Sequence, residues 1–173
     1  MEILDLYDKD RKKLEGQTVI RGDVQPANTY RMVVHICIFD SQGRLLIQHR
    51  QPFKKGWPNK WDVTVGGCAI TGETSQQAAE REVREEIGLS LDLSSERPAI
   101  TPNFDKGFDD FYLLRRDVDI DRLVLQYEEV KEVRWAALEE VLQMIDDGSF
   151  VQYHKDFVRL LFYLKDGREI YTD

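Results

Sequence analysis

Three glutamates near the middle of the chain have the spacing of a cluster on one helical face. Glu82, Glu85 and Glu86 stand at positions i, i+3 and i+4, so a helix through them projects all three carboxylates from the same side. Like charges at this spacing destabilise a helix unless a cation offsets them. Magnesium prefers carboxylate oxygens and bridges substrate phosphates. These residues are therefore predicted to hold Mg²⁺, or Mn²⁺, against a small-molecule substrate that contains phosphate.

The glutamates belong to a longer pattern of fixed residue types. From Gly67 to Leu89 the chain reads Gly-x5-Glu-x7-Arg-Glu-Val-x-Glu-Glu-x-Gly-Leu. At ordinary residue usage, a chance match to this pattern has a probability on the order of 10⁻⁹ per starting point. The stretch resembles the box of the Nudix family at every defining position. The resemblance implies an α/β fold, a Nudix-type α/β/α sandwich with a mixed β-sheet, and a pyrophosphohydrolase that cleaves a phosphorus anhydride.

Arg81 and the glycines of the pattern have roles that geometry also favours. Arg81 points off the glutamate face, where its guanidinium can pair with both oxygens of Glu73 and fix the preceding loop against the helix. The Nudix resemblance implies the same pairing and also counts Arg81 among the catalytic residues. Gly67 lets the backbone approach a neighbour closely, and Gly88 suits the residue that follows the helix.

The resemblance also assigns the metal ligands and a general base. It implies that Glu82, Glu85, Glu86 and the backbone carbonyl of Gly66 bind the metal, with Glu86 also a catalytic residue. Glu129 lies in a later loop, about where Nudix enzymes often carry an additional metal ligand or the general base. The alternative for Glu129 is an ordinary surface charge.

Three basic residues precede the box and are candidates for substrate binding. Arg50 stands at the end of a predicted strand, and Lys54 and Lys55 lie in the loop that follows. Their charges suit phosphate oxygens, although a solvated surface role explains each of them as well. No residue of the chain identifies a base-reading site, so a nucleoside di- or triphosphate is the expected substrate on the resemblance alone.

A second activity must be weighed, because Asp23–Glu73 resembles the Nudix branch related to isopentenyl diphosphate isomerase. That isomerase needs a cysteine where this chain has Gly66 and a metal-binding histidine where it has Cys68. A histidine near Arg31 and a Glu-x-Glu within residues 104–110 are also missing. Hydrolysis is therefore favoured. The isomerase is one alternative, and a noncatalytic, nucleotide-binding regulatory Nudix domain is another.

Apolar periodicity and turn residues predict the elements that position this site. A helix is expected over Ser75–Ile87, capped by Thr74 or Ser75. The strands at 31–39 and 44–50 surround the turn Asp-Ser-Gln-Gly and are expected to form a hairpin. The other predicted strands are Ile3–Tyr7, Gln17–Arg21, Trp61–Val65, Phe108–Arg115 and Val130–Trp135, and the later helices are Leu138–Ile145 and about His154–Leu164.

Composition bounds the class of protein. The 173 residues contain no linker or repeat, which predicts one Nudix domain over 1–173 with an N-terminal strand extension over 1–30. The formal net charge of -8 argues against binding to a nucleic acid polymer. No apolar run approaches the ~18 residues of a membrane helix, and no secretory signal is evident, so a cytoplasmic protein is expected. Cys37 and Cys68 are expected to be reduced, and the resemblance makes a homodimer a candidate assembly.

Overall fold

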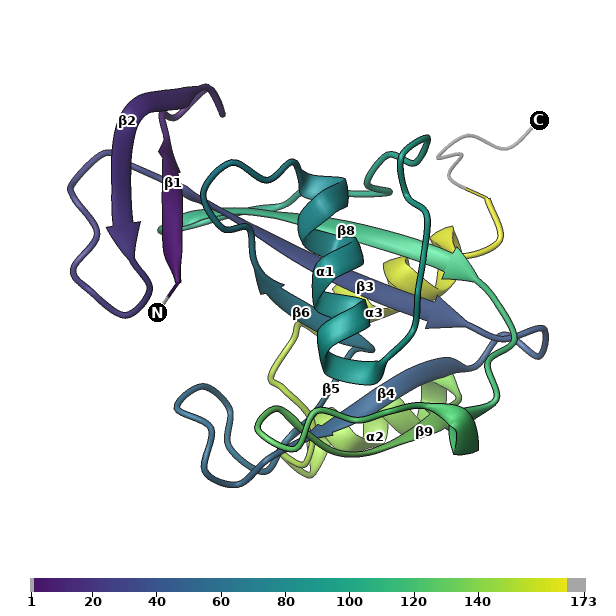
Figure 1. Cartoon of the computed structure of the whole chain (residues 1–173). Coiled ribbons are helices and arrows are strands. Elements are labelled where there is room, and N and C mark those ends of the chain that lie inside the picture. Colours follow the sequence, from purple (N-terminus) through teal and green to yellow (C-terminus); the bar gives the residue numbers. More distant parts are fainter. Residues whose placement is uncertain (1, 168–173) are drawn as a thin grey trace.

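A seven-stranded sheet forms the centre of the computed structural model, which describes residues 2–167 (Figure 1). The strand order is β5-β4-β3-β8-β7, with β6 also pairing with β3 and β9 with β4. Strands β3 and β8 run parallel and the other pairs run antiparallel, so the sheet is mixed. The strands are β3 (Arg31–Phe39), β4 (Leu45–Arg50), β5 (Trp61–Asp62), β6 (Val65–Cys68), β7 (Asn103–Phe104), β8 (Gly107–Arg115) and β9 (Val130–Ala136).

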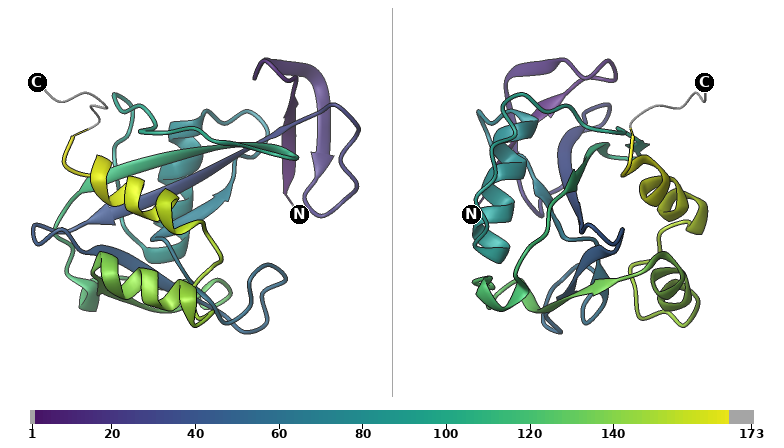
Figure 2. Two further views of the ribbon diagram at one scale, coloured as in Figure 1. Left: turned by 180° about the vertical axis from the view of Figure 1, so that it is seen from behind. Right: turned by 90° about the vertical axis from the view of Figure 1, so that its right-hand side faces the viewer.

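Helices cover both faces of this sheet. The helix α1 (Ser75–Ile87) lies on one face, and α2 (Leu138–Asp146) and α3 (Lys155–Leu164) lie on the other (Figure 2). This arrangement confirms the predicted α/β/α sandwich and each of its three helices. Within residues 2–167, no helix is long and apolar enough to cross a lipid bilayer.

The two cores are separated by the alternation of side chains along β3. Val34, Ile36 and Ile38 are fully buried on the α1 side. Cys37 and Phe39 are fully buried on the side of α2 and α3. Successive strand residues point to opposite faces, so one apolar run supplies both cores.

The bounds of α1 follow from its local capping residues. Thr74 is the N-cap: its side chain accepts a hydrogen bond from the Gln77 backbone, and the Gln77 side chain accepts one from the Thr74 backbone. At the other end Gly88 adopts a left-handed conformation with φ 68°, and its N–H donates to the Arg84 carbonyl. Both ends agree with the sequence prediction, and they fix which residues face the sheet.

The predicted hairpin of β3 and β4 exists only at its turn. The two strands pair at Phe39 and Leu45 and then diverge. Between them the Thr64 hydroxyl accepts a hydrogen bond from the Ile38 N–H at 2.9 Å and donates to the Leu46 carbonyl at 2.5 Å. A buried side chain therefore replaces the ladder that a continuous hairpin would have formed.

The single strand predicted over residues 61–65 is instead two short strands, which lie where β3 and β4 diverge. The chain pairs with β4 as β5, turns at Val63 and Thr64, and then pairs with β3 as β6. The prediction was wrong there because a period-2 pattern shows that residues are extended, but not that they change partner strand. The two-residue β7 and the short 3-10 helix η1 (Ile120–Arg122) were not predicted, since neither is long enough to show a period.

The N-terminal residues form a separate two-stranded antiparallel sheet near the start of β3 and the loop before α1 (Figure 1). Its strands are β1 (Ile3–Tyr7) and β2 (Lys13–Ile20), so the second strand starts four residues before the predicted one. The backbone of Thr71 donates to the Ile3 carbonyl at 2.8 Å. That bond ties the strand pair to the loop that leads into α1.

Candidate active site

The predicted metal ligands lie around one small cavity beside α1. Its volume is about 50 Å³. Glu82 and Glu86 are buried, whereas the Glu85 side chain is 49% exposed. Five residues singled out from the sequence line this cavity, together with three that the sequence did not indicate. The lining is Gly66, Glu82, Glu85, Glu86 and Glu129, with Glu2, Arg21 and Gln126 as the additions.

Gly67 is required because the Glu82 carboxylate lies against the backbone of β6. A Cβ atom at Gly67 would come within 2.0 Å of Glu82 Oε1 and 2.1 Å of its Cδ. Real Cβ atoms essentially never approach this closely, and the contact would push the carboxylate away. The backbone therefore helps to set the position of Glu82. The close approach at Gly67 agrees with the sequence prediction, but its neighbour Glu82 was not predicted.

Arg81 joins the loop before α1 to the glutamate face. Its Nε and Nη2 donate to the two oxygens of Glu73 at 2.7 and 2.9 Å, so the predicted bidentate pair is present. Nη2 also donates to the Cys68 carbonyl at 3.0 Å, and Nη1 lies 2.9 Å from Glu82 Oε1 and 3.2 Å from Glu85 Oε2. The hydrogen bonds to Glu73 lead the effects that raise the pKa of Arg81. With these contacts Arg81 is a positioning residue.

Glu86 is the most strongly perturbed carboxyl of the site. Burial, followed by the negative charges of Glu82 and Glu129, raises its pKa to about 8. The Gln48 side chain donates to its Oε2 at 3.0 Å and offsets only part of that effect. Burial also raises the pKa of Glu82, although Arg81 opposes the shift. Near neutral pH the buried Glu86 carboxyl therefore tends to hold a proton until a cation approaches.

The chemistry of these donors fits a hard divalent cation. Glu82 Oε1 is buried and makes no hydrogen bond, because the nearby Arg81 Nη1 is within ion-pair distance but is not aligned to donate. The ion pair offsets the charge of this buried oxygen but leaves its hydrogen-bonding capacity unmet, and a metal ion would satisfy it. Within residues 2–167, no group of three or more His, Cys, Asp and Glu side chains already converges as a metal site. A metal ion at the cavity would therefore compete with Arg81 for the oxygens of Glu82 and Glu85.

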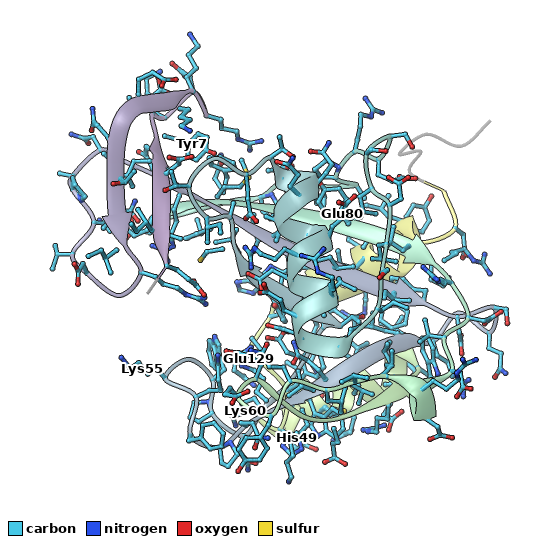
Figure 3. The ribbon with its side chains drawn as sticks, in the orientation of Figure 1. Tyr7, His49, Lys55, Lys60, Glu80 and Glu129 are labelled. Carbon is cyan, nitrogen blue, oxygen red and sulfur yellow. The ribbon has the colours of Figure 1, made fainter. Side chains whose placement is uncertain are left out.

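Glu129 and the three predicted phosphate contacts lie at the loop that follows β4. The Glu129 carboxylate forms an ion pair with Lys54. Arg50 donates through Nε and Nη2 to the Gly56 carbonyl at 3.2 and 3.1 Å, which holds the loop together. Lys55 is exposed at the tip of the loop and points away from Glu129 (Figure 3). The cavity is not lined by Arg50, Lys54 or Lys55, and its one cationic lining residue is Arg21.

His35 occupies the space on the other side of Gly66. Its Nδ1 lies 2.8 Å from Asp109 Oδ1, and its ring stacks on Phe111 with the centroids 4.8 Å apart. A Cβ atom at Gly66 would lie 2.4 Å from His35 Cδ2. A cysteine at Gly66 would therefore require His35 to move, which bears on the isomerase alternative.

The raised pKa of Glu86 gives a prediction about stability without metal. In the folded protein Glu86 keeps its proton up to its pKa of about 8, whereas in the unfolded chain a glutamate with its ordinary pKa of 4.5 has already released it. The free energy of unfolding of wild type therefore falls as pH rises from about 4.5 to about 8. Gln cannot ionise and still accepts from Gln48, so Glu86→Gln is expected to remove this dependence. At about 1.4 kcal/mol per pKa unit, the variant should gain roughly 2 to 4 kcal/mol over wild type across that range.

Urea unfolding in excess chelator at several pH values measures this gain. Glu128→Gln, an exposed change of the same chemistry, is the control and should follow wild type. A constant difference between Glu86→Gln and wild type from pH 5 to pH 9 would contradict the prediction.

Comparison with known proteins bears on the site as a whole. The family model described as NUDIX domain matches residues 29–161. An uncharacterized Nudix hydrolase of Listeria monocytogenes is 44% identical over 171 residues, which are 99% of each chain. An isopentenyl-diphosphate Delta-isomerase of Brevibacterium linens is 30% identical over 155 residues, covering 84% of this chain and 82% of the other. A crystal structure from Deinococcus radiodurans has a TM-score of 0.73 at 28% identity, covering 92% of this chain and 97% of that one.

Proposed function

This chain belongs to the Nudix family of hydrolases that act on pyrophosphate bonds, and from that premise we propose that it is a Mg²⁺-dependent pyrophosphohydrolase of nucleoside di- or triphosphates. The observation that carries the proposal is the pair of buried carboxylates at the cavity. Glu82 has an oxygen without a hydrogen bond, and Glu86 has a raised pKa beside it. Clustered acids in this state are expected where a cation and a phosphate ester meet.

The site residues divide into metal-holding and proton-accepting groups. Glu82, Glu85, Glu86 and the Gly66 carbonyl would hold the metal, and Mn²⁺ suits the same oxygen donors. When bound, the metal neutralises charge on the phosphate oxygens of the substrate. Arg81 keeps Glu73 and the loop before α1 in place, so the glutamates stay on one side of the substrate.

Hydrolysis then requires a base for the attacking water. A carboxylate takes a proton from the water, and the water oxygen bonds to phosphorus. The bond from phosphorus to the bridging oxygen breaks, and its electron pair stays on the leaving phosphate. Two residues are candidates for this base. Glu86 lines the cavity, and its raised pKa makes its carboxylate a stronger base than an ordinary glutamate once the proton has left. Glu129 lines the same cavity and would first have to leave its ion pair with Lys54.

The isomerase relatives make isopentenyl diphosphate isomerisation the second candidate function. That chemistry needs a cysteine at the place of Gly66, and the ring of His35 fills the adjoining space. Cys68 lies two residues further along β6, is buried, and lines a different cavity. These observations favour hydrolysis.

A panel of substrates tests the proposal directly. We expect release of orthophosphate or pyrophosphate from at least one nucleoside di- or triphosphate when Mg²⁺ or Mn²⁺ is present. Exhaustive chelation should abolish this activity, because the glutamate cluster would then repel the phosphates and Arg21 alone cannot neutralise both charges. Isopentenyl diphosphate belongs in the same panel, with its allylic isomer as the product assayed. Formation of that isomer without hydrolysis of any nucleotide would make isomerisation the better-supported function. Full activity in chelator would show that the reaction does not need a metal ion.

A further inference from the structure

The N-terminal strand pair reaches the glutamate cavity although it lies outside the matched family segment. That segment begins at residue 29, whereas β1 and β2 end before it. Glu2 and Arg21, which flank the open end of the pair, nevertheless line the cavity together with Glu82 and Glu86. The Listeria monocytogenes relative aligns over 99% of this chain, so it extends across the strand pair as well.

A second cavity adjoins the first, and Arg21 lines both of them. The second cavity has a volume of about 360 Å³ and lies between β2 and the start of β3. Arg21 and Arg31 both line it, with Gln25 and Cys68. Two guanidinium groups beside a cluster of carboxylates form the charge pattern that a polyphosphate needs, because the metal neutralises only the phosphates it touches.

The contacts of the two arginines leave donors for a ligand. The Arg21 side chain is 46% exposed, and its Nη1 donates a hydrogen bond to Glu2 Oε2 at 2.6 Å. Arg31 donates from Nη1 to Gln25 Oε1 at 2.9 Å. A guanidinium has five N–H donors in a planar fork, so one such bond does not exhaust either residue.

We propose that Arg21, assisted by Arg31, binds a phosphate group of the substrate beyond the linkage that is cleaved. The N-terminal strand pair is thus one wall of the substrate site, and Glu2 holds the Arg21 guanidinium until the phosphate takes its place. This assignment rests on the proposed hydrolysis for the identity of the substrate. The binding of an anion at this place is inferred from the two cavities and their arginines alone, and it does not depend on the proposed hydrolysis.

Binding of inorganic pyrophosphate and of α,β-methylene-ADP, measured by calorimetry in Mg²⁺, tests the assignment. Loss of a charge-assisted hydrogen bond weakens binding by roughly 10- to 100-fold, and this is the expected rise in Kd for Arg21→Ala. Arg21→Lys keeps the positive charge but loses the planar guanidinium, so its Kd should lie between those of wild type and Arg21→Ala. It is also the variant to use if Arg21→Ala does not fold. Glu2→Gln removes the competing carboxylate, so its Kd should fall below that of wild type. If the ion pair between Glu2 and Arg21 only stabilised the fold, Glu2→Gln would instead raise the Kd above that of wild type.

Lys12→Ala is the matched control. It removes one positive charge from the same strand pair, but at the opposite end, next to the residue that pairs with Tyr7. Its Kd should equal that of wild type. If Arg21→Ala binds both probes as wild type does, the assignment is wrong, whether or not nucleotides are hydrolysed. If Arg21→Ala weakens binding but wild type hydrolyses no nucleotide in the panel, the anion site stands and the proposed function fails.

Discussion

Glu82→Gln and Glu86→Gln are each expected to lower turnover of the preferred substrate by about 10²- to 10³-fold, the usual consequence of removing one interaction made with the charge of the transition state. Both residues are buried at the cavity, and Gln replaces each with little change of shape. The loss should therefore appear in kcat and in the Mg²⁺ dependence, while the folded state is preserved. Steady-state kinetics over a magnesium titration measures both quantities.

Glu80→Gln is the control for these two variants. Glu80 lies on another side of α1 (Figure 3), where its Oε1 accepts a hydrogen bond from the Leu93 backbone at 2.6 Å. Gln retains that acceptor, so turnover should stay near wild type. Glu129→Gln separates the two candidate bases: a large loss of kcat with unchanged metal affinity identifies Glu129, and a small loss leaves the role to Glu86. Wild-type turnover in both Glu82→Gln and Glu86→Gln would contradict the catalytic interpretation of α1.

Gly67→Ala should be nearly as damaging as Glu82→Gln, although it adds only a methyl group. The new Cβ would lie 2.0 Å from Glu82 Oε1, so the carboxylate must leave its position. We expect a fall in kcat of about 10²-fold, because the metal interaction of Glu82 is lost with its geometry. In the Glu82→Gln background the same change should have a much smaller further effect on kcat, since both substitutions disable one group.

Gly56→Ala is the matched control for this prediction. Gly56 lies in the loop after β4, and a Cβ there meets nothing within 4 Å. Its kinetics should match those of wild type. If Gly67→Ala kept full turnover, the close approach of Glu82 to β6 would have no functional meaning, whatever the outcome for the glutamates.

The parts of the fold that could be predicted are those whose signals are local in the sequence. Thr74 and Gly88 mark the ends of α1 through bonds to residues three or four positions away, so the helix and its glutamate face could be read directly. The parting of β3 and β4 could not, because it depends on the Thr64 hydroxyl, which reaches both strands from a distant segment. Periodicity predicts which residues are extended or helical, but it does not predict which strands pair with each other.

The same distinction applies to the site. The family pattern gathered Gly66, Glu82 and Glu86, and the cavity contains all three. Arg21 was missed because it stands far before Gly66 in the sequence, in a turn just after β2 that carries no motif. Lys54 was predicted to bind phosphate from its charge and its nearness to the box, and that role stays a prediction; its ion pair with Glu129 was not predicted. Which charged side chains contact each other depends on the path of the loop backbone, and residue types alone do not specify that path.

The position of Arg81 has a consequence for the order of events in the cell. Its guanidinium contacts Glu73, Glu82 and Glu85 at once, so the acidic cluster contains an internal counter-ion. Mutual repulsion among the carboxylates is thereby reduced before any metal arrives. Under the proposed function, the helix can therefore complete its folding before a cation binds, and folding of this protein should not require Mg²⁺.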